Sequence, residues 1–201
     1  MYYFAYGSNL LTARLTARTP SARPVGIAHL PGWQLRFHKA GTDGSGKGDI
    51  VPVDGDRVTG VLYRLRPREL RRLDRAEGAG YARRRIAVRI DGHMQRCETY
   101  IATDTDPALR PYDWYRRLIL AGLLEHGIAG ATLQLVQQQL DIPDPRTLRP
   151  ARLRALQALR DFQKRNPSLA SRLIAATAYG PAARDWTAPS GSAGDSPPEV
   201  H

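Results

Sequence analysis

The succession of strand and helix signals along the chain predicts an α+β fold with an antiparallel or mixed sheet. Several apolar or alternating segments are joined by Asp-Gly turn signals, which are typical of β-hairpins, and helical patterns interrupt them. With 201 residues, of which 42% are hydrophobic, the chain is long enough to bury the core of one domain.

The first half of the chain combines short strands with one helix. The expected elements are, in order, a strand at 2–6, a helix at 9–18, one or two strands within 23–37, and strands at 50–53 and 57–65. Pro31-Gly32 marks a bend, and Asp54-Gly55 between the last two strands predicts a hairpin. The glycine-rich stretch 41–48 lacks the Lys-Ser/Thr pair of a phosphate loop, so we expect an active-site lid or a plain connector.

The second half of the chain becomes increasingly helical. The expected elements are a helix from Pro67 to about Gly78, strands at 81–90 and 94–102 joined by a hairpin turn at Asp91-Gly92-His93, a helix from Pro111 to about His126, and helical patterns at 131–139 and 150–164. Ile86, Val88 and Ile90 share one face of their strand and predict that it is buried. From Pro181 the chain is rich in Ser, Pro and Gly, so we expect a disordered tail.

The chain is strongly basic, with a net charge of +11. Only Lys39, Lys47 and Lys164 are lysines, and the arginines are spread along the chain. The densest group, Arg64–Arg75, lies on and beside a predicted helix and is explained by a solvated face, so a nucleic-acid partner is not favoured. No apolar stretch reaches the ~18 residues of a membrane span, and no membrane partner is expected.

Several common chemistries lack their residues. The five histidines show no metal-ligand spacing, and the sequence has no Cys-x-x-Cys or Gly-x-Ser-x-Gly motif. Cys97 is the single cysteine and cannot form an internal disulfide, which agrees with a cytoplasmic location. We therefore expect no metal site and no thiol or serine-triad mechanism.

Carboxylates and tyrosines remain as candidates for chemistry. Among five glutamates, Glu77 stands at the end of a predicted helix, directly before Gly78-Ala79-Gly80. The helix dipole disfavours a negative charge at this end. Such a glutamate is either tolerated at a frayed helix end or retained for function.

The N-terminal strand runs into Gly7-Ser8-Asn9, the most informative local feature. Gly7 lets a ligand approach the main chain closely, and Ser8 and Asn9 are good helix N-caps. The first N–H groups of the following helix lack intrahelical partners and lie at the positive end of its dipole. Two interpretations stay open, an anion-binding turn or an ordinary capped helix behind a core strand.

Three motifs, in order, resemble the γ-glutamylcyclotransferase family. Residues 3–11 (Tyr-Phe-Ala-Tyr-Gly-Ser-Asn-Leu-Leu) resemble its first signature, and residues 73–78 (Leu-Asp-Arg-Ala-Glu-Gly) with the following Tyr81 resemble its second. Residues 115–122, with His126-Gly127 after them, resemble its late helix. The match fades after residue 127, which leaves the leaving-group specificity open.

The resemblance implies a small, closed or nearly closed β-barrel with helices packed outside. It also implies a catalytic domain over residues 1–130. The helical patterns beyond it predict a C-terminal extension at 131–180 packed on this domain, and the composition predicts the tail at 181–201. Glu77 stands where the family has its catalytic glutamate. The positions that match substrate-binding residues of the family are Tyr6, Gly7, Ser8, Asn9, Leu10, Tyr81, Tyr100 and Tyr115.

The activity that the resemblance implies is intramolecular aminolysis of a small γ-glutamyl substrate. Its α-amine attacks the γ-carbonyl and forms 5-oxoproline, with Glu77 as general acid and base and without a cofactor. One alternative is a cyclotransferase that removes a γ-glutamyl protecting group in a biosynthetic pathway. Another is a non-catalytic binding protein on the same fold, against which the intact turn and Glu77 argue. A role in glutathione metabolism is expected, and a homodimer stays open.

Overall fold

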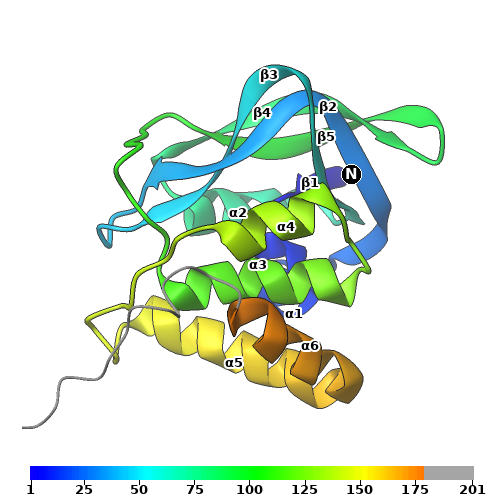
Figure 1. The fold of residues 1–201 in the computed structure, drawn as a ribbon. Helices are drawn as coiled ribbons and strands as arrows, with labels where there is room; N and C mark the ends of the chain where they lie inside the picture. The colour runs from blue at the N-terminus through cyan, green and yellow to red at the C-terminus, as the bar shows by residue number, and fades with distance from the viewer. Residues whose placement is uncertain (179–201) are drawn as a thin grey trace, which may run out of the picture.

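In the computed structural model, which describes residues 1–178, five strands close into a barrel in the order β1-β3-β2-β4-β5 (Figure 1). The strands are β1 (Tyr2–Ala5), β2 (Arg23–Ala40), β3 (Gly46–Arg64), β4 (Tyr81–Ile90) and β5 (His93–Ala102). Neighbouring strands are antiparallel except β1 and β5, which close the barrel in parallel through Tyr3 and Glu98. The α+β fold with a small mixed barrel is thereby confirmed, including the closure that the family resemblance alone implied.

The hairpin predicted at Asp54-Gly55 is wrong. β2 and β3 are long strands that pair with each other, and the register shifts between Pro31 and Trp33. Residues 53–56 therefore bulge out opposite Gly32, and the segments on both sides of this bulge pair with β2. Gly32 and Gly55 have φ angles of 76° and 79°. The turn signals Pro31-Gly32 and Asp54-Gly55 thus lie opposite each other and form one bulge within the continuous β2–β3 pair.

The glycine-rich stretch predicted as a lid or a connector joins β2 to β3. Gly41 N–H donates to the carbonyl of Ser45 (2.9 Å), and Gly44 has a φ of 81°. The stretch is therefore the turn of the β2–β3 hairpin, and its residues 41–43 also border the cavity described below.

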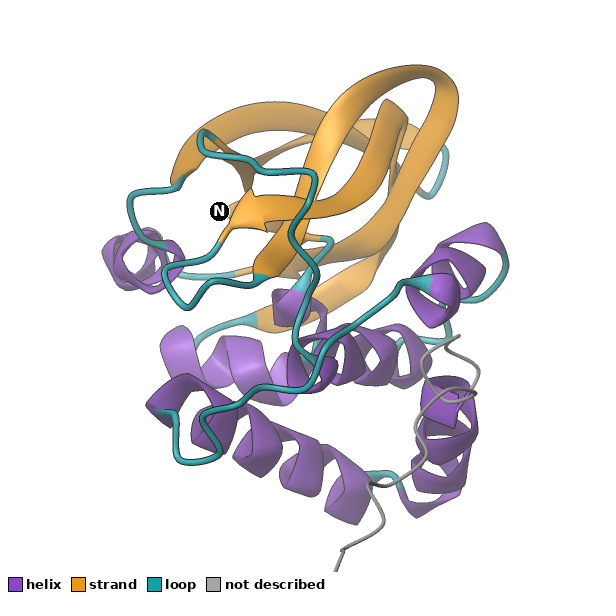
Figure 2. Cartoon of the chain, turned by 60° about the vertical axis from the view of Figure 1, so that its left-hand side comes forward, coloured by secondary structure: helices purple, strands orange, loops and turns teal. Residues whose placement is uncertain are grey.

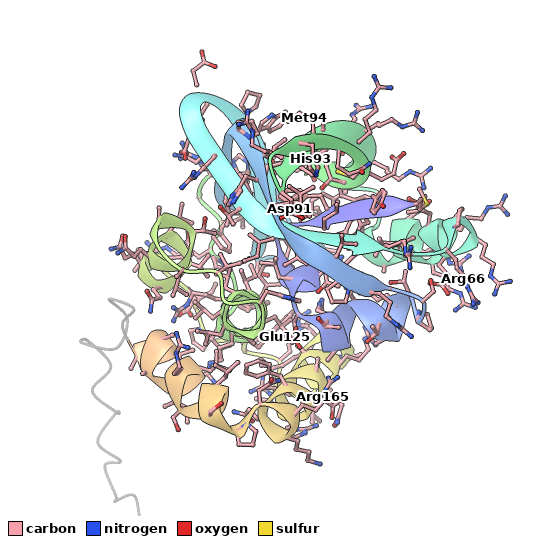
Figure 3. All side chains as sticks on the ribbon, turned by 90° about the vertical axis from the view of Figure 1, so that its right-hand side faces the viewer. Arg66, Asp91, His93, Met94, Glu125 and Arg165 are labelled. Carbon is pink, nitrogen blue, oxygen red and sulfur yellow. The ribbon has the colours of Figure 1, made fainter. Side chains whose placement is uncertain are left out.

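The hairpin predicted at Asp91-Gly92-His93 is confirmed. Ile90 pairs with His93, and Asp91 and Gly92 have φ angles of 46° and 83°. Positive φ at both central residues is the turn geometry that matches the twist of two antiparallel strands. Figure 3 labels Asp91, His93 and Met94 at this turn. Of the face predicted to be buried, Val88 and Ile90 are buried and Ile86 is half-buried, while Arg89 is exposed.

The helices lie outside the barrel (Figures 1 and 2). They are the 3₁₀ helices η1 (Ser8–Leu10) and η2 (Pro67–Glu69) and the α-helices α1 (Thr12–Arg18), α2 (Leu70–Glu77), α3 (Asp113–Glu125), α4 (Ala131–Gln138), α5 (Pro150–Arg165) and α6 (Pro167–Ala178). α3 lies between the barrel and α5 and α6. Its successive residues Leu118, Ile119 and Leu120 are fully buried, because neighbours cover every side of the helix.

The C-terminal helices extend the fold beyond the barrel. α4 and α5 confirm the helical patterns at 131–139 and 150–164, and α6 follows with Pro167 at the first-turn position that proline favours. The domain division at residue 130 stays a prediction, and the predicted tail at 181–201 lies outside the described residues. None of the described helices is long and apolar enough to cross a membrane.

Candidate active site

Two adjoining spaces lie where the barrel meets α1, α2 and α3. The larger, which we call the outer cavity, has a volume of about 730 Å³, and the smaller, the inner chamber, has about 30 Å³. The inner chamber is lined by Tyr3, Tyr6, Gly7, Ser8, Asn9, Gly48, Glu77, Tyr81, Tyr100 and Tyr115. All the site residues predicted from the sequence are among them except Leu10, which is fully buried in the core.

Glu77 lies at the boundary between the two spaces and lines both. It is the last residue of α2, which ends because Gly78 takes a φ of 76°. Its Oε1 accepts hydrogen bonds from Arg18 Nη1 and from Asn9 Nδ2, each at 2.8 Å. The ion pair with Arg18 offsets the unfavourable position at the helix C-terminus. Within the described chain both bonds fall on Oε1, so Oε2 is left for a ligand.

The side chain of Asn9 holds this arrangement together. Its Nδ2 donates to Tyr3 Oη (2.9 Å) as well as to Glu77, and its Oδ1 accepts from Arg18 Nη1 (2.9 Å). Because donors and acceptors match in only one orientation of the amide, the side chain is fixed. Asn9 is 4% exposed and therefore serves the site rather than capping a helix.

The helix start differs from the predicted N-cap. The 3₁₀ helix η1 precedes α1, which begins at Thr12 with Leu11 as its N-cap residue and without a side-chain cap. Ser8 Oγ instead accepts a hydrogen bond from Arg14 Nε (3.1 Å). The two residues chosen as caps therefore bind residues of the site.

The turn leaves main-chain donors beside the inner chamber. Leu10 N–H donates to the Gly7 carbonyl (2.9 Å), which is the first hydrogen bond of the turn. The N–H groups of Ser8 and Asn9 come before it and therefore make no hydrogen bond within the turn. Gly7 has a φ of −110°, so it does not use the left-handed freedom of glycine. A Cβ at Gly7 would lie 3.5 Å from Tyr115 Oη, an ordinary contact that would narrow the chamber.

Three of the predicted tyrosines form the wall of the inner chamber. Tyr115 Oη accepts a hydrogen bond from Gly48 N–H (2.9 Å), and Tyr81 Oη donates to the Gly48 carbonyl (2.5 Å). Tyr6 Oη donates to the carbonyl of Tyr100. These hydroxyls fix the rings and the start of β3, so the wall is set before a ligand binds.

Tyr100 also lines the inner chamber, but its hydroxyl is directed elsewhere. Tyr100 Oη donates to Asp74 Oδ1 (2.8 Å), which lies half-exposed on α2.

Burial raises the pKa values of the chamber tyrosines, which are Tyr3, Tyr6, Tyr81, Tyr100 and Tyr115. Their hydroxyls therefore stay protonated at neutral pH and can donate hydrogen bonds.

Metal and thiol chemistry have no site among residues 1–178. No group of three or more His, Cys, Asp or Glu side chains in this range is arranged to hold a metal ion. Cys97 is buried, and burial raises the pKa of its thiol to about 12, so the side chain stays a thiol at neutral pH.

A half-buried histidine fixes the other end of the turn. His126 Nε2 lies 3.1 Å from the Leu10 carbonyl and 3.0 Å from Tyr63 Oη. Thr12 Oγ1 lies 3.2 Å from the same nitrogen. The end of α3 thereby holds the segment that follows the site residues Ser8 and Asn9.

We expect His126 to make the protein less stable in mild acid. Burial lowers the pKa of His126 despite the nearby Glu125. The unfolded chain then binds more protons than the folded protein, so stability is present above the ordinary histidine pKa of ~6.5 and is lost as the pH falls through the folded value. The free energy of unfolding, measured in urea at pH 7 and pH 5, should fall less in His126→Gln than in wild type; equal losses would contradict this.

Sequence reasoning missed the cations of the outer cavity. Arg14 and Arg18 are four residues apart in α1 and share one helix face, a spacing that could have identified them. Lys39 and Lys47 flank the glycine-rich turn, and both line the outer cavity. Two of the three lysines in an arginine-rich chain thus lie at one site, which was a signal in the composition.

Comparison with known proteins agrees with this geometry. A family model described as "Gamma-glutamyl cyclotransferase, AIG2-like" matches residues 3–117, more than half of the chain. The chain belongs to this family. Human gamma-glutamylcyclotransferase is 33% identical over 135 residues, which cover 63% of this chain and 71% of the human protein. The mouse protein of the same name is 33% identical over 152 residues, which cover 71% and 78%.

A solved structure supports the same assignment. A protein titled "Gamma-glutamyl cyclotransferase" superposes with a TM-score of 0.71 at 25% identity, and covers 82% of this chain and 98% of the other. The chain is thus an enzyme of the cyclotransferase type.

The family match ends before α4, yet α5 contributes residues to the outer cavity. Part of the site wall therefore lies outside the family match.

Proposed function

We propose that the protein releases 5-oxoproline from γ-glutamyl amino acids or amides by intramolecular aminolysis, with Glu77 as general acid and base. One observation carries the proposal: Glu77 lines the inner chamber and is held there through Oε1 by Arg18 and Asn9, while its Oε2 has no hydrogen-bond partner among the described residues. The names of the curated relatives support the reaction class.

The reaction needs one base that becomes an acid. The substrate α-amine is protonated at neutral pH, because its ordinary pKa is near ~8. Glu77 Oε2 takes one proton, and the amine nitrogen then attacks the γ-carbonyl carbon to form the new C–N bond of a five-membered lactam. Glu77 returns this proton to the departing nitrogen as the original amide C–N bond breaks, and the second proton of the ring nitrogen passes to the released amine. The products are 5-oxoproline and the leaving group as an ammonium ion, and Glu77 is again a carboxylate.

The inner chamber supplies position and hydrogen bonds. The substrate must fold back so that its amine meets its own carbonyl, and holding that geometry removes most of the entropic barrier. We assign the N–H groups of Ser8 and Asn9 to the α-carboxylate or to the oxyanion that forms on the γ-carbonyl. The rings of Tyr6, Tyr81 and Tyr115 limit the space to a folded substrate.

The reaction predicts a strict requirement for a free α-amine. N-acetylation of a γ-glutamyl substrate should abolish turnover, because the acetylated nitrogen is not a nucleophile. The assay is the release of 5-oxoproline from γ-glutamylalanine and from its N-acetyl derivative, followed by liquid chromatography.

The identity of the product separates this mechanism from hydrolysis. A hydrolase would use water, tolerate the acetyl group and release glutamate. Free glutamate from the unblocked substrate would therefore overturn the proposal. The α-linked isomer is the matched control and should not react, because its amide carbonyl lies too close to the amine for a five-membered ring to form.

A further inference from the structure

The outer cavity contains a buried amine that no carboxylate of the described residues neutralises. Lys39, at the end of β2, is 5% exposed, and its Nζ lies 5.1 Å from the ring centroid of Tyr81. Nζ also packs against Gly80, because a Cβ added to this glycine would lie only 2.7 Å from Nζ. A cation–π contact stabilises an ammonium group less than a paired carboxylate does. The cavity thus holds a positive charge without its counterion.

Arg14 contributes a second such charge from α1. Its Nε donates to Ser8 Oγ, and no described carboxylate forms an ion pair with its guanidinium. Burial, and then the neighbouring Arg18, lower the pKa of Arg14 to about 9, so it is still charged at neutral pH. Arg154 of α5 also lines the cavity and contributes to this lowering.

The basic composition of the chain does not explain these two residues. Exposed arginines are well solvated and need no partner, whereas Lys39 is buried and Arg14 is half-buried, and an unpaired charge withdrawn from water lowers stability. Two other cations of the wall, Lys47 and Arg18, each pair with a carboxylate, at 2.9 Å and 2.8 Å. Lys39 and Arg14 differ from them in lacking a carboxylate partner, so a bound anion would stabilise both.

We infer that the outer cavity receives the leaving group and selects one with two carboxylates, so that the preferred substrates are γ-glutamyl derivatives of dicarboxylic amino acids. This inference rests on the proposed function, because the leaving group must extend from the inner chamber past Glu77 and Tyr81. Any amino acid leaving group brings its α-carboxylate. A dicarboxylic one brings a second, which matches two of the cavity cations that lack a carboxylate partner, Lys39 and Arg14.

Two dipeptides of nearly equal shape test the inference. γ-Glutamylglutamate and γ-glutamylglutamine differ by one charge at the end of the leaving group. We expect kcat/KM for 5-oxoproline release to favour the first by about tenfold or more, as for a charge-assisted hydrogen bond in a partly buried site. The preference should shrink as salt is raised, because the contact is electrostatic.

Variants then assign the preference to residues. Lys39→Met should bring the ratio of the two kcat/KM values close to one, and Lys39→Arg should retain most of it. Arg154→Gln, an exposed position, should lower the ratio by about twofold to fivefold. The matched control is Arg165→Gln, which removes the same charge from the exposed end of α5 (Figure 3) outside the cavity and should leave the ratio unchanged.

The outcomes separate this inference from the proposed function. Equal kcat/KM values for the two dipeptides in wild type overturn it, as does a preference that both Lys39→Met and Arg154→Gln leave intact. If Lys39→Met does not fold, Arg154→Gln against Arg165→Gln decides. If neither dipeptide gives 5-oxoproline, the proposed function fails. The charge preference of the outer cavity is then tested by calorimetric binding of the two dipeptides, and equal Kd values overturn the inferred preference.

Discussion

Replacing Glu77 by glutamine is expected to lower turnover by about 10²–10⁴-fold, the usual contribution of a general acid and base, while the protein stays folded. Glutamine keeps the shape of the side chain and can still accept the hydrogen bond from Asn9. Its amide cannot take the proton of the substrate amine. The measurement is kcat for 5-oxoproline release, together with the midpoint of thermal unfolding to show that the fold is retained.

A second glutamate provides the control for this variant. Glu98 on β5 is half-buried, pairs with the exposed Arg85 at 3.2 Å and lines neither the inner chamber nor the outer cavity. Glu98→Gln removes the same charge, and we expect its turnover to match wild type. A folded Glu77→Gln protein that works at the rate of Glu98→Gln would remove Glu77 from the mechanism.

The fold could be predicted where the deciding contacts are local. The hairpin at residues 91–93 follows from two turn residues between alternating segments, and the structure has it there. The same Asp-Gly signal failed at Asp54-Gly55, because its flanks pair with β2, far away in the sequence. Barrel closure depends on the pairing of Tyr3 with Glu98, which no local pattern encodes. The family motifs supplied it.

The candidate site shows the same division. Glu77 and the turn at residues 7–9 lie within motifs, so the sequence could indicate them. Arg18, which lies 59 positions from Glu77, is joined to it only by the packing of α1 against α2. Lys39 is notable for its burial without a carboxylate partner, and burial at a given position depends on the whole tertiary structure.

Replacing Arg116 by methionine is expected to lower the free energy of unfolding by about 3–5 kcal/mol, the usual cost of breaking a buried ion pair. Arg116 is 4% exposed, and its guanidinium donates to the Asp141 carboxylate at 2.5 Å. It also donates to the carbonyls of Gln137 and Thr177, each at 3.2 Å. Methionine fills a similar volume but leaves Asp141 unpaired. Urea denaturation at neutral pH measures the loss.

A double variant separates charge from packing. Arg116→Met combined with Asp141→Leu removes both charges and should recover most of the stability, because the main cost is the unpaired carboxylate. A double variant no more stable than the single one would contradict this explanation. Arg116 lies inside the family match, whereas its three partners lie beyond it. One arginine thus fastens the end of α4, the α4–α5 connection and α6 to α3, next to α5, which lines the outer cavity.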